Sequence, residues 1–118
     1  MNVIVDKSKA FAIRIIRLYQ FLTTEKKEYI LSKQLLRCGT SIGANVREGI
    51  FGQSKPDFHT KMTIALKEAG ETEYWLELLY ETDYLTVEQF NSITSDCKEV
   101  LKILIAITKA TKKISNEK

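Results

Sequence analysis

Residues 54–79 read SKPDFHTKMTIALKEAGETEYWLELL, and this segment sets the expected fold class. Apolar or small residues recur in it at alternating spacings of four and three, which is the period of one face of an α-helix. They are Phe58, Met62, Ala65, Ala69, Thr72, Leu76 and Leu79. Ser54 stands before this face as an N-cap, with Pro56 in the first turn and Asp57 three residues on. The segment predicts a long amphipathic helix that begins after Ser54.

Three further segments carry the same helical period. Their apolar positions are Phe11, Ile15, Leu18 and Leu22 in the first, Leu31, Leu35, Cys38, Ile42 and Gly49 in the second, and Phe90, Ile93, Cys97, Leu101, Leu104, Thr108 and Ile114 in the last. We expect Asp6 to cap the first helix, the second to run from about residue 28 to about residue 48, and Thr86 to open the last with a capping box.

Only a few residues connect these segments, so consecutive helices should be antiparallel neighbours. The sequence therefore predicts an all-α protein, an antiparallel up-down-up-down four-helix bundle. One domain should span residues 1–118, with residues 115–118 as a frayed tail.

Composition places the chain among ordinary globular proteins, since 44% of its 118 residues are hydrophobic and 28% are charged. Charges interrupt every apolar run, and the first residues lack the layout of a signal peptide, so we expect a cytoplasmic protein without a membrane partner. Cys38 and Cys97 are too few for a disulfide framework, and both fall on apolar helical faces. They are expected to be small buried hydrophobes.

Catalytic motifs are missing from the sequence. The sole histidine, His59, has no glutamate three positions before it, which excludes the usual di-iron constellation of four-helix bundles. The glycines match neither of the common phosphate-binding loops. We therefore expect no enzyme activity, no metal and no cofactor.

Charge is distributed unevenly along the chain. Residues 1–67 contain twelve Lys/Arg and five Asp/Glu, whereas residues 68–99 contain one Lys and nine Asp/Glu. In an antiparallel bundle the starts of the first and third helices share one end with the ends of the second and fourth. This basic pole would collect Lys7, Lys9, Arg47, Lys55, Lys109, Lys112 and Lys113.

A basic pole predicts contact with phosphate backbones. The alternative for Lys109, Lys112 and Lys113 is that they complement the dipole at a helix C-terminus. The basic set contains no aromatic residue, so the sequence gives no indication of base stacking.

A polar stripe accompanies the apolar face of the second helix. It contains Arg37, Ser41, Asn45 and Glu48, beside the small residues Gly39, Gly43 and Ala44. Such a stripe is either a ligand pocket or a buried or interfacial network that sets register or subunit geometry, and we favour the network.

Aromatic residues at the edges of the predicted core predict a homo-oligomer, because they would otherwise face water. They are Phe21, Tyr29, Tyr74, Trp75 and Tyr80. Glu71 and Glu73 flank part of this set, and basic faces of the first two helices could meet them on a neighbouring subunit.

The run Ser41–Gly49, SIGANVREG, is similar to the SIxANIxEG signature of the four-helix bundle family of 23S rRNA intervening-sequence proteins. The match extends through residues 34–37, Ser54, Phe58, and residues 65–69 and 71–76. The resemblance implies an up-down bundle assembled into a ring-like homopentamer. Relatives include accessory proteins of diversity-generating retroelements, which bind nucleic acid and a reverse transcriptase. The chain departs from the pattern at Gln53, where relatives often carry a basic residue.

Two function classes follow. The first is an oligomeric, non-enzymatic accessory protein that binds RNA or DNA through the basic pole, with a protein partner such as a reverse transcriptase. The second is a homo-oligomeric protein-interaction scaffold without nucleic-acid affinity. They differ in whether the basic pole is accessible in the assembled ring.

Overall fold

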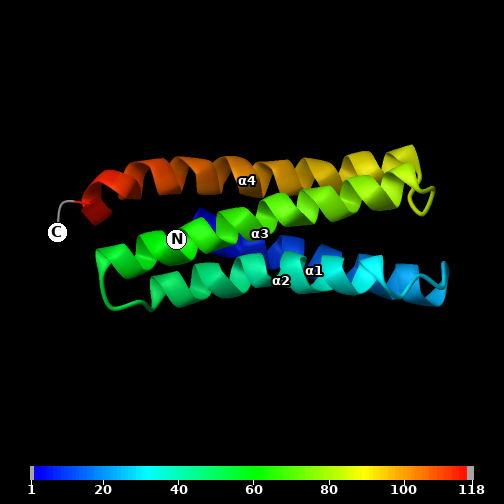
Figure 1. Ribbon diagram of the computed structural model, residues 1–118, viewed down its shortest axis with the longest axis horizontal. Coiled ribbons are helices and arrows are strands. Elements are labelled where there is room, and N and C mark those ends of the chain that lie inside the picture. The colour runs from blue at the N-terminus through cyan, green and yellow to red at the C-terminus, as the bar shows by residue number, and fades with distance from the viewer. Residues whose placement is uncertain (1, 117–118) are drawn as a thin grey trace.

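The computed structural model describes residues 2–116, with side chains for residues 2–112, and this part of the chain forms four α-helices. They are α1 (Val3–Thr24), α2 (Leu31–Ile50), α3 (Lys55–Glu81) and α4 (Val87–Asn116) (Figure 1). The described residues contain no strand, and the body measures 50 × 24 × 20 Å. The predicted all-α fold is confirmed. We expected a frayed tail from residue 115, but α4 extends to Asn116, and residues 117–118 lie outside the described part.

Neighbouring helices run in opposite directions, as Figure 1 shows. In each pair, the residue numbers of the contacts rise along one helix as they fall along the other. The contacting pairs are Lys7–Glu99 and Arg14–Asp96 for α1 and α4, Arg37–Glu71 and Glu48–Lys61 for α2 and α3, and His59–Thr111 and Tyr80–Phe90 for α3 and α4. The up-down-up-down arrangement follows from this register.

Two predicted capping motifs are present in the structure. The Ser54 hydroxyl accepts a hydrogen bond from the Asp57 backbone N–H at 3.2 Å, which starts α3. At the start of α4, the Thr86 hydroxyl accepts from the Gln89 N–H at 3.1 Å, and the Gln89 side chain accepts from the Thr86 N–H at 2.8 Å. These bonds satisfy backbone donors that a helix start leaves free.

The predicted cap of α1 at Asp6 is wrong. The helix begins at Val3, and the side-chain oxygen of Asn2 accepts a hydrogen bond from the Ile4 N–H at 3.2 Å. Asn2 has the extended backbone that an N-cap requires, so Asp6 falls inside the first turn, where a carboxylate complements the helix dipole.

Glu28 joins α1 to α2. Its backbone N–H donates to the Leu22 carbonyl near the end of α1, at 2.9 Å. Its carboxylate accepts hydrogen bonds from the N–H groups of Ile30, Leu31 and Ser32 at 3.1, 2.8 and 2.7 Å, so α2 begins at Leu31 rather than at residue 28. Burial acts to raise the pKa of Glu28, but these donors outweigh burial and hold the pKa below its ordinary value.

The predicted apolar faces form the core. Every position of the α3 face is buried except Phe58, which is half-buried. Both cysteines are fully buried and free, as expected. The Thr72 hydroxyl donates to Cys38 Sγ at 3.1 Å, and the Cys97 thiol donates to the Ala69 carbonyl at 3.6 Å. Burial, with Glu73 nearby, raises the pKa of Cys97 to about 12.

The seams between the helices differ in closeness. Gly39 of α2 lies against Ile15 of α1 so closely that an added Cβ would stand 2.8 Å from the Ile15 Cγ atoms. This confirms the close approach that the small residues of α2 predict. Packing between α1 and α4 is by far the least extensive of the four seams. One side of α1 is therefore tightly packed, and the other is only loosely covered.

No helix in the described residues combines the length and the apolar character needed to cross a membrane. Over the same range, no group of three or more His, Cys, Asp or Glu is placed to hold a metal ion.

Candidate nucleic-acid interface and subunit-contact surfaces

Lys9 of α1 and Arg47 of α2 line the same surface groove. The groove has a volume of about 280 Å³, and small residues line it between the two cations: Ser8, Ala12, Gly43 and Ala44. No acidic residue lines it. Both cationic side chains are exposed, and neither forms an ion pair with any side chain in residues 2–112. An anion in this groove would meet two positive charges.

The remaining residues of the basic pole differ in whether an acidic side chain neutralises their charge. Lys7 forms an ion pair with Glu99 at 3.2 Å, so its charge is partly neutralised. Lys55 is the first residue of α3 and is exposed, as are Lys109 and Lys112 near the end of α4. These last three form no ion pair within the described side chains. The Lys113 side chain lies outside the described residues.

Lys7 and Lys9 lie inward from the end of the bundle. Lys7 is level with Glu99, whereas His59, in the second turn of α3, is level with Thr111. The twelve residues between these two levels of α4 correspond to about 18 Å along the axis. The basic residues are therefore spread along this half of the molecule, with Lys55, Lys109 and Lys112 nearest its end.

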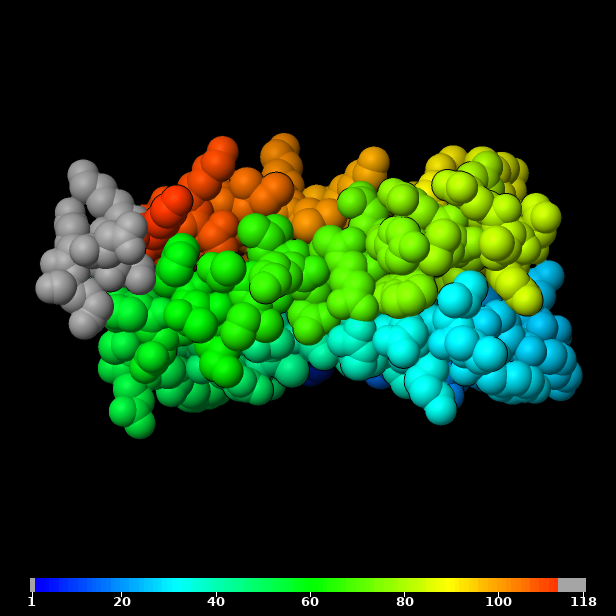
Figure 2. All heavy atoms as spheres, in the orientation of Figure 1, coloured from blue at the N-terminus to red at the C-terminus, as the bar shows by residue number. Residues whose placement is uncertain are grey.

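Most acidic residues of α3 and α4 either form ion pairs or lie far from the basic pole. Glu68 and Glu71 pair with Arg37, Asp96 pairs with Arg14, and Glu99 pairs with Lys7. Three others stand at the opposite end of the bundle, around the α3–α4 turn: Glu81, Asp83 and Glu88 (Figure 1). In the space-filling view, α2, α3 and α4 cover the face toward the viewer and α1 is almost hidden behind them (Figure 2).

Arg37, Glu71 and Trp75 form one polar network across α2 and α3. Arg37 donates a hydrogen bond to the Glu71 carboxylate and lies 3.5 Å from Glu68 Oε1. The Trp75 indole N–H donates to the same Glu71 carboxylate at 3.0 Å. Glu73, which the sequence placed with this group, instead lines a shallow depression beside Lys98. The sequence thus predicts three of the partners, but not how they pair.

Ser41, Asn45 and Glu48 do not form a buried network within the chain. Ser41 donates to the Arg37 carbonyl at 2.7 Å and Asn45 donates to the Ser41 carbonyl at 2.8 Å, so both bond to their own helix. The Glu48 side chain is 58% exposed and pairs with Lys61 of α3 at 2.8 Å. The buried interpretation is corrected for Glu48, and an interfacial role stays a prediction.

The aromatic residues expected at subunit contacts divide into two groups. Tyr80 stacks on Phe90 with ring centroids 4.4 Å apart, and Trp75 bonds to Glu71, so both have partners in the chain. Tyr29 and Tyr74 are more than half exposed. The fifth, Phe21, is half-buried, with Lys26 Nζ 5.9 Å from its ring centroid. Of the five, Tyr29 and Tyr74 present large aromatic surface to water.

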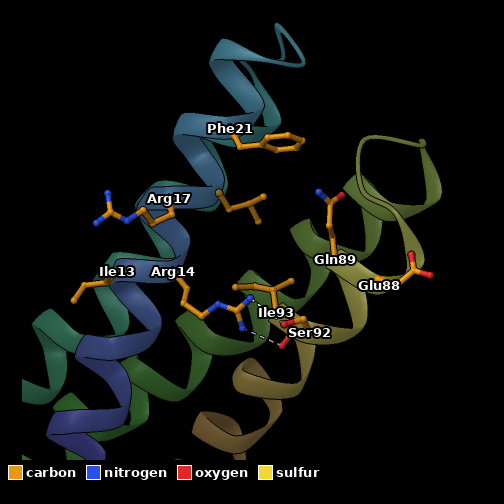
Figure 3. A pocket seen from close by; sticks show the side chains of 9 residues that line it. Ile13, Arg14, Arg17, Phe21, Glu88, Gln89, Ser92 and Ile93 are labelled. Carbon is orange, nitrogen blue, oxygen red and sulfur yellow. Dashed lines mark hydrogen bonds between the residues drawn. The ribbon is translucent and has the colours of Figure 1, made fainter.

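A groove between α1 and α4 was not predicted. It has a volume of about 690 Å³, and its lining includes Ile13, Leu18 and Phe21 of α1 and Gln89 and Ile93 of α4. Arg14 reaches across it to the hydroxyl of Ser92 at 3.0 Å, as Figure 3 shows. Ile13 in this lining is exposed, as are Val3 and Ile16 elsewhere on α1. No sequence signal marks this groove, because it arises from how far α1 stands from α4.

Phe51 is an exposed aromatic residue that the sequence reasoning missed. It ends α2, with 83% of its surface exposed, four residues after Arg47 and four before Lys55. The available signal was an aromatic residue inside a predicted turn with a cation one helical turn away on each side.

Comparison with known proteins identifies the family. Residues 2–106 match the sequence model of the family described as 23S rRNA-intervening sequence protein. A crystal structure described as a protein with unknown function from the S23 ribosomal protein family of Bacteroides thetaiotaomicron VPI-5482 is 59% identical and superposes with a TM-score of 0.89. The match covers 91% of this chain and 99% of that one. No curated protein sequence matches the chain. Since the match spans nearly all of the bundle, the chain belongs to the 23S rRNA-intervening sequence protein family.

Proposed function

We propose that the chain is a homo-oligomeric accessory protein that binds nucleic acid through its basic pole. The observation that carries this proposal is the Lys9–Arg47 groove, which holds two cations and no acid in its lining. Positive charges without internal partners can neutralise phosphates and release counterions, which is the main source of sequence-independent affinity. Lys55, Lys109 and Lys112 add exposed cations at the same end of the bundle.

The acids of residues 68–99 do not argue against this surface. Four of the nine are engaged by Arg37, Arg14 or Lys7, and three more lie around the far turn of a body 50 Å long. A separation of this size exceeds the screening length of about 8 Å at physiological salt. A strand at the basic pole would therefore meet little repulsion from them.

Self-association is supported by the loosely covered side of α1. The groove between α1 and α4 and the exposed Val3, Ile13 and Ile16 together leave an apolar surface that a second copy would bury. The family resemblance implies a ring of five. In a cyclic ring all basic poles face the same side, and each chain adds a net charge of +3, so several weak contacts would act together.

Nucleic-acid binding is tested by fluorescence anisotropy with labelled RNA and DNA at ~50 mM salt and above. We expect wild-type affinity to fall steeply as salt rises, with a logarithmic slope of about 0.9 for each duplex phosphate neutralised. A Lys9→Glu/Arg47→Glu variant and a Lys109→Glu/Lys112→Glu/Lys113→Glu variant should both bind more weakly. The matched control is Lys26→Glu/Lys27→Glu, which makes the same change at the opposite pole.

Equal binding by the wild type and both basic-pole variants would contradict the proposal. So would the absence of binding by the wild type. A control variant that binds as weakly as the basic-pole variants would mean that net charge alone, and not the pole, determines affinity.

Self-association is tested by light scattering at micromolar concentration. A single species near 13.6 kDa would remove it. We expect Ile13→Asp to reduce the mass, since it places a charge in the exposed apolar face of α1, whereas Lys33→Asp, at an exposed position of α2, should not. Asn45→Ala and Glu48→Ala should shift the mass as well, if their role is at the subunit interface.

A second candidate, a protein-interaction scaffold, is favoured by the same α1–α4 groove. Its lining is largely apolar, a character better suited to a protein partner than to a phosphate backbone. An oligomer that assembles normally and binds neither RNA nor DNA would select this function.

A further inference from the structure

Phe51 stands at the end of α2 without support from the core. Its backbone follows α2, because its N–H donates to the Arg47 carbonyl at 3.2 Å. Its exposed fraction, 83%, exceeds that of the other large hydrophobic residues that the structure describes as exposed. Exposing an aromatic ring to this extent forgoes the free energy that burial would provide.

Phe51 lies on the same face of α2 as three residues that line the groove with the two cations. Thr40, Ala44, Arg47 and Phe51 follow one another at spacings of four, three and four, so they share one face of α2. The first three line the groove. Phe51 follows Arg47 by one turn, about 6 Å along the helix axis. A chain of phosphates lying in the groove would therefore pass beside the ring.

Cations flank the ring on both sides of the turn. Arg47 precedes it by four residues, and the exposed Lys55 follows it by four at the start of α3. The acids nearest to Phe51 in sequence are Glu48 and Asp57, and Asp6 stands in the first turn of α1 at the same end of the bundle. Glu48 is paired with Lys61 at 2.8 Å, and Asp57 stands in the first turn of α3, where the helix dipole offsets its charge. The local field around Phe51 thus favours an anion.

We infer that Phe51 is a stacking platform for an unpaired base of a single-stranded nucleic acid whose phosphates lie along Lys9, Arg47 and Lys55. Sites for single strands combine cations that follow the backbone with an aromatic ring on which a base stacks. A paired base inside a duplex is already stacked on both faces and cannot receive the ring. The inference rests on the proposed function and adds to it a preference for single strands over duplexes.

The test compares Phe51→Ala with the wild type on a labelled oligothymidylate and on a blunt DNA duplex. We expect the substitution to weaken single-strand binding at least fivefold and to leave duplex binding within about twofold of wild type. The salt dependence should keep its slope, because the substitution removes no charge. Phe51→Trp should restore single-strand affinity, since it retains an aromatic surface.

Ile30→Ala is the control, because Ile30 is a large exposed hydrophobic residue in the turn at the opposite pole and is not among the residues expected at subunit contacts. It should bind both probes as the wild type does. Light scattering on each variant separates stacking from assembly. A lower mass for Phe51→Ala would assign the ring to a subunit contact and overturn the inference.

Failure of the inference differs from failure of the proposed function. Phe51→Ala binding the single strand like wild type, while Lys9→Glu/Arg47→Glu loses affinity, would overturn the stacking role and keep the basic pole. Wild-type protein that binds neither probe would overturn both.

Discussion

The two sides of α1 differ in how they meet the rest of the bundle. On the α2 side, Gly39 lets the backbones come so close that Ile15 fills the space a side chain would need. On the α4 side, a groove of about 690 Å³ lies between the two helices, and Arg14 and Lys7 form ion pairs with exposed acids of α4. Close packing gives way to long polar side chains within the width of a single helix.

This difference separates the part of the molecule that holds the fold from the part that is free to bind. Dense packing between α1 and α2 carries stability, because any added atom must displace a buried one. The α1–α4 side contributes mainly exposed ion pairs, which are worth little in water. A partner that covers the α1–α4 side would gain apolar contacts without breaking tight ones.

Gly39→Val should have the largest effect on stability. Its branched side chain would overlap Ile15, which is fully buried and has no room to move. We expect a loss of about 3 kcal/mol in the free energy of unfolding, measured in urea. Gly70→Val is the control, since nothing stands within 4 Å of an added Cβ there. Equal losses at the two glycines would show that helix propensity, and not the close seam, is responsible.

Arg37→Ala measures how much an arginine in the closely packed α2–α3 seam contributes to the free energy of unfolding. Glu68 Oε1 is buried without a hydrogen-bond partner, and Arg37 is the cation beside it, at 3.5 Å. Removing the guanidinium leaves that carboxylate and Glu71 uncompensated, so we expect a loss of about 1–2 kcal/mol, moderated by the partial exposure of Arg37. Thermal unfolding at low and high salt checks this, and a loss that vanishes at high salt would contradict it.

Glu28→Gln tests how much the Glu28 carboxylate stabilises the connection between α1 and α2. At neutral pH we expect a loss of about 1 kcal/mol, because the three backbone hydrogen bonds are divided between both carboxylate oxygens, whereas the neutral amide of Gln has one acceptor oxygen and no charge. The folded-state pKa of Glu28 is depressed, so its contribution is present above the ordinary value of 4.5 and is lost as the pH falls through the folded-state pKa.

The measurement is the difference in unfolding free energy between Glu28→Gln and wild type across this range of pH. The difference should shrink as the solution is acidified. Glu25→Gln, at an exposed position three residues earlier, should show no such trend. A difference that stays constant down to acid pH would mean that the charge of Glu28 is not what holds α2.

Arg14→Ala should have the smallest effect. Both members of the Arg14–Asp96 pair are more than 40% exposed, so solvent and salt screen them. We expect a change of about 0.5 kcal/mol in the unfolding free energy of the unassembled chain. A loss as large as that of Arg37→Ala would show that an arginine on the α1–α4 side contributes as much stability as one in the closed α2–α3 seam.

The fold could be predicted because its determinants are local in sequence. The spacing from Met62 to Leu79 and the caps at Ser54 and Thr86 each depend on residues within a few turns. Two helix starts were misplaced for the same reason. Asn2 precedes the apolar face that located the first helix, and Glu28 caps α2 with a longer side chain than the usual N-cap residues.

The candidate site was predicted only as a set of residues. That Lys9 shares a groove with Arg47, and that Lys7 is bound to Glu99, follow from the relative register and rotation of three helices. Apolar spacing indicates which face of a helix is buried but not which side chains meet across a seam. Phe51 was overlooked because an aromatic residue near a helix end is ordinarily taken as a core residue, and its exposure depends on where the turn leaves α2.

The two buried thiols can report how often the helices of the bundle separate. Cys38 of α2 and Cys97 of α4 are both buried against α3. Cys38 accepts a hydrogen bond from the Thr72 hydroxyl, and Cys97 donates one to the Ala69 carbonyl. A thiol reagent can reach either sulfur only after that helix parts from α3, and the raised pKa of Cys97 keeps its thiol protonated until then. The labelling rates of the two cysteines therefore time the opening of the two seams separately, in a protein that carries no substitution.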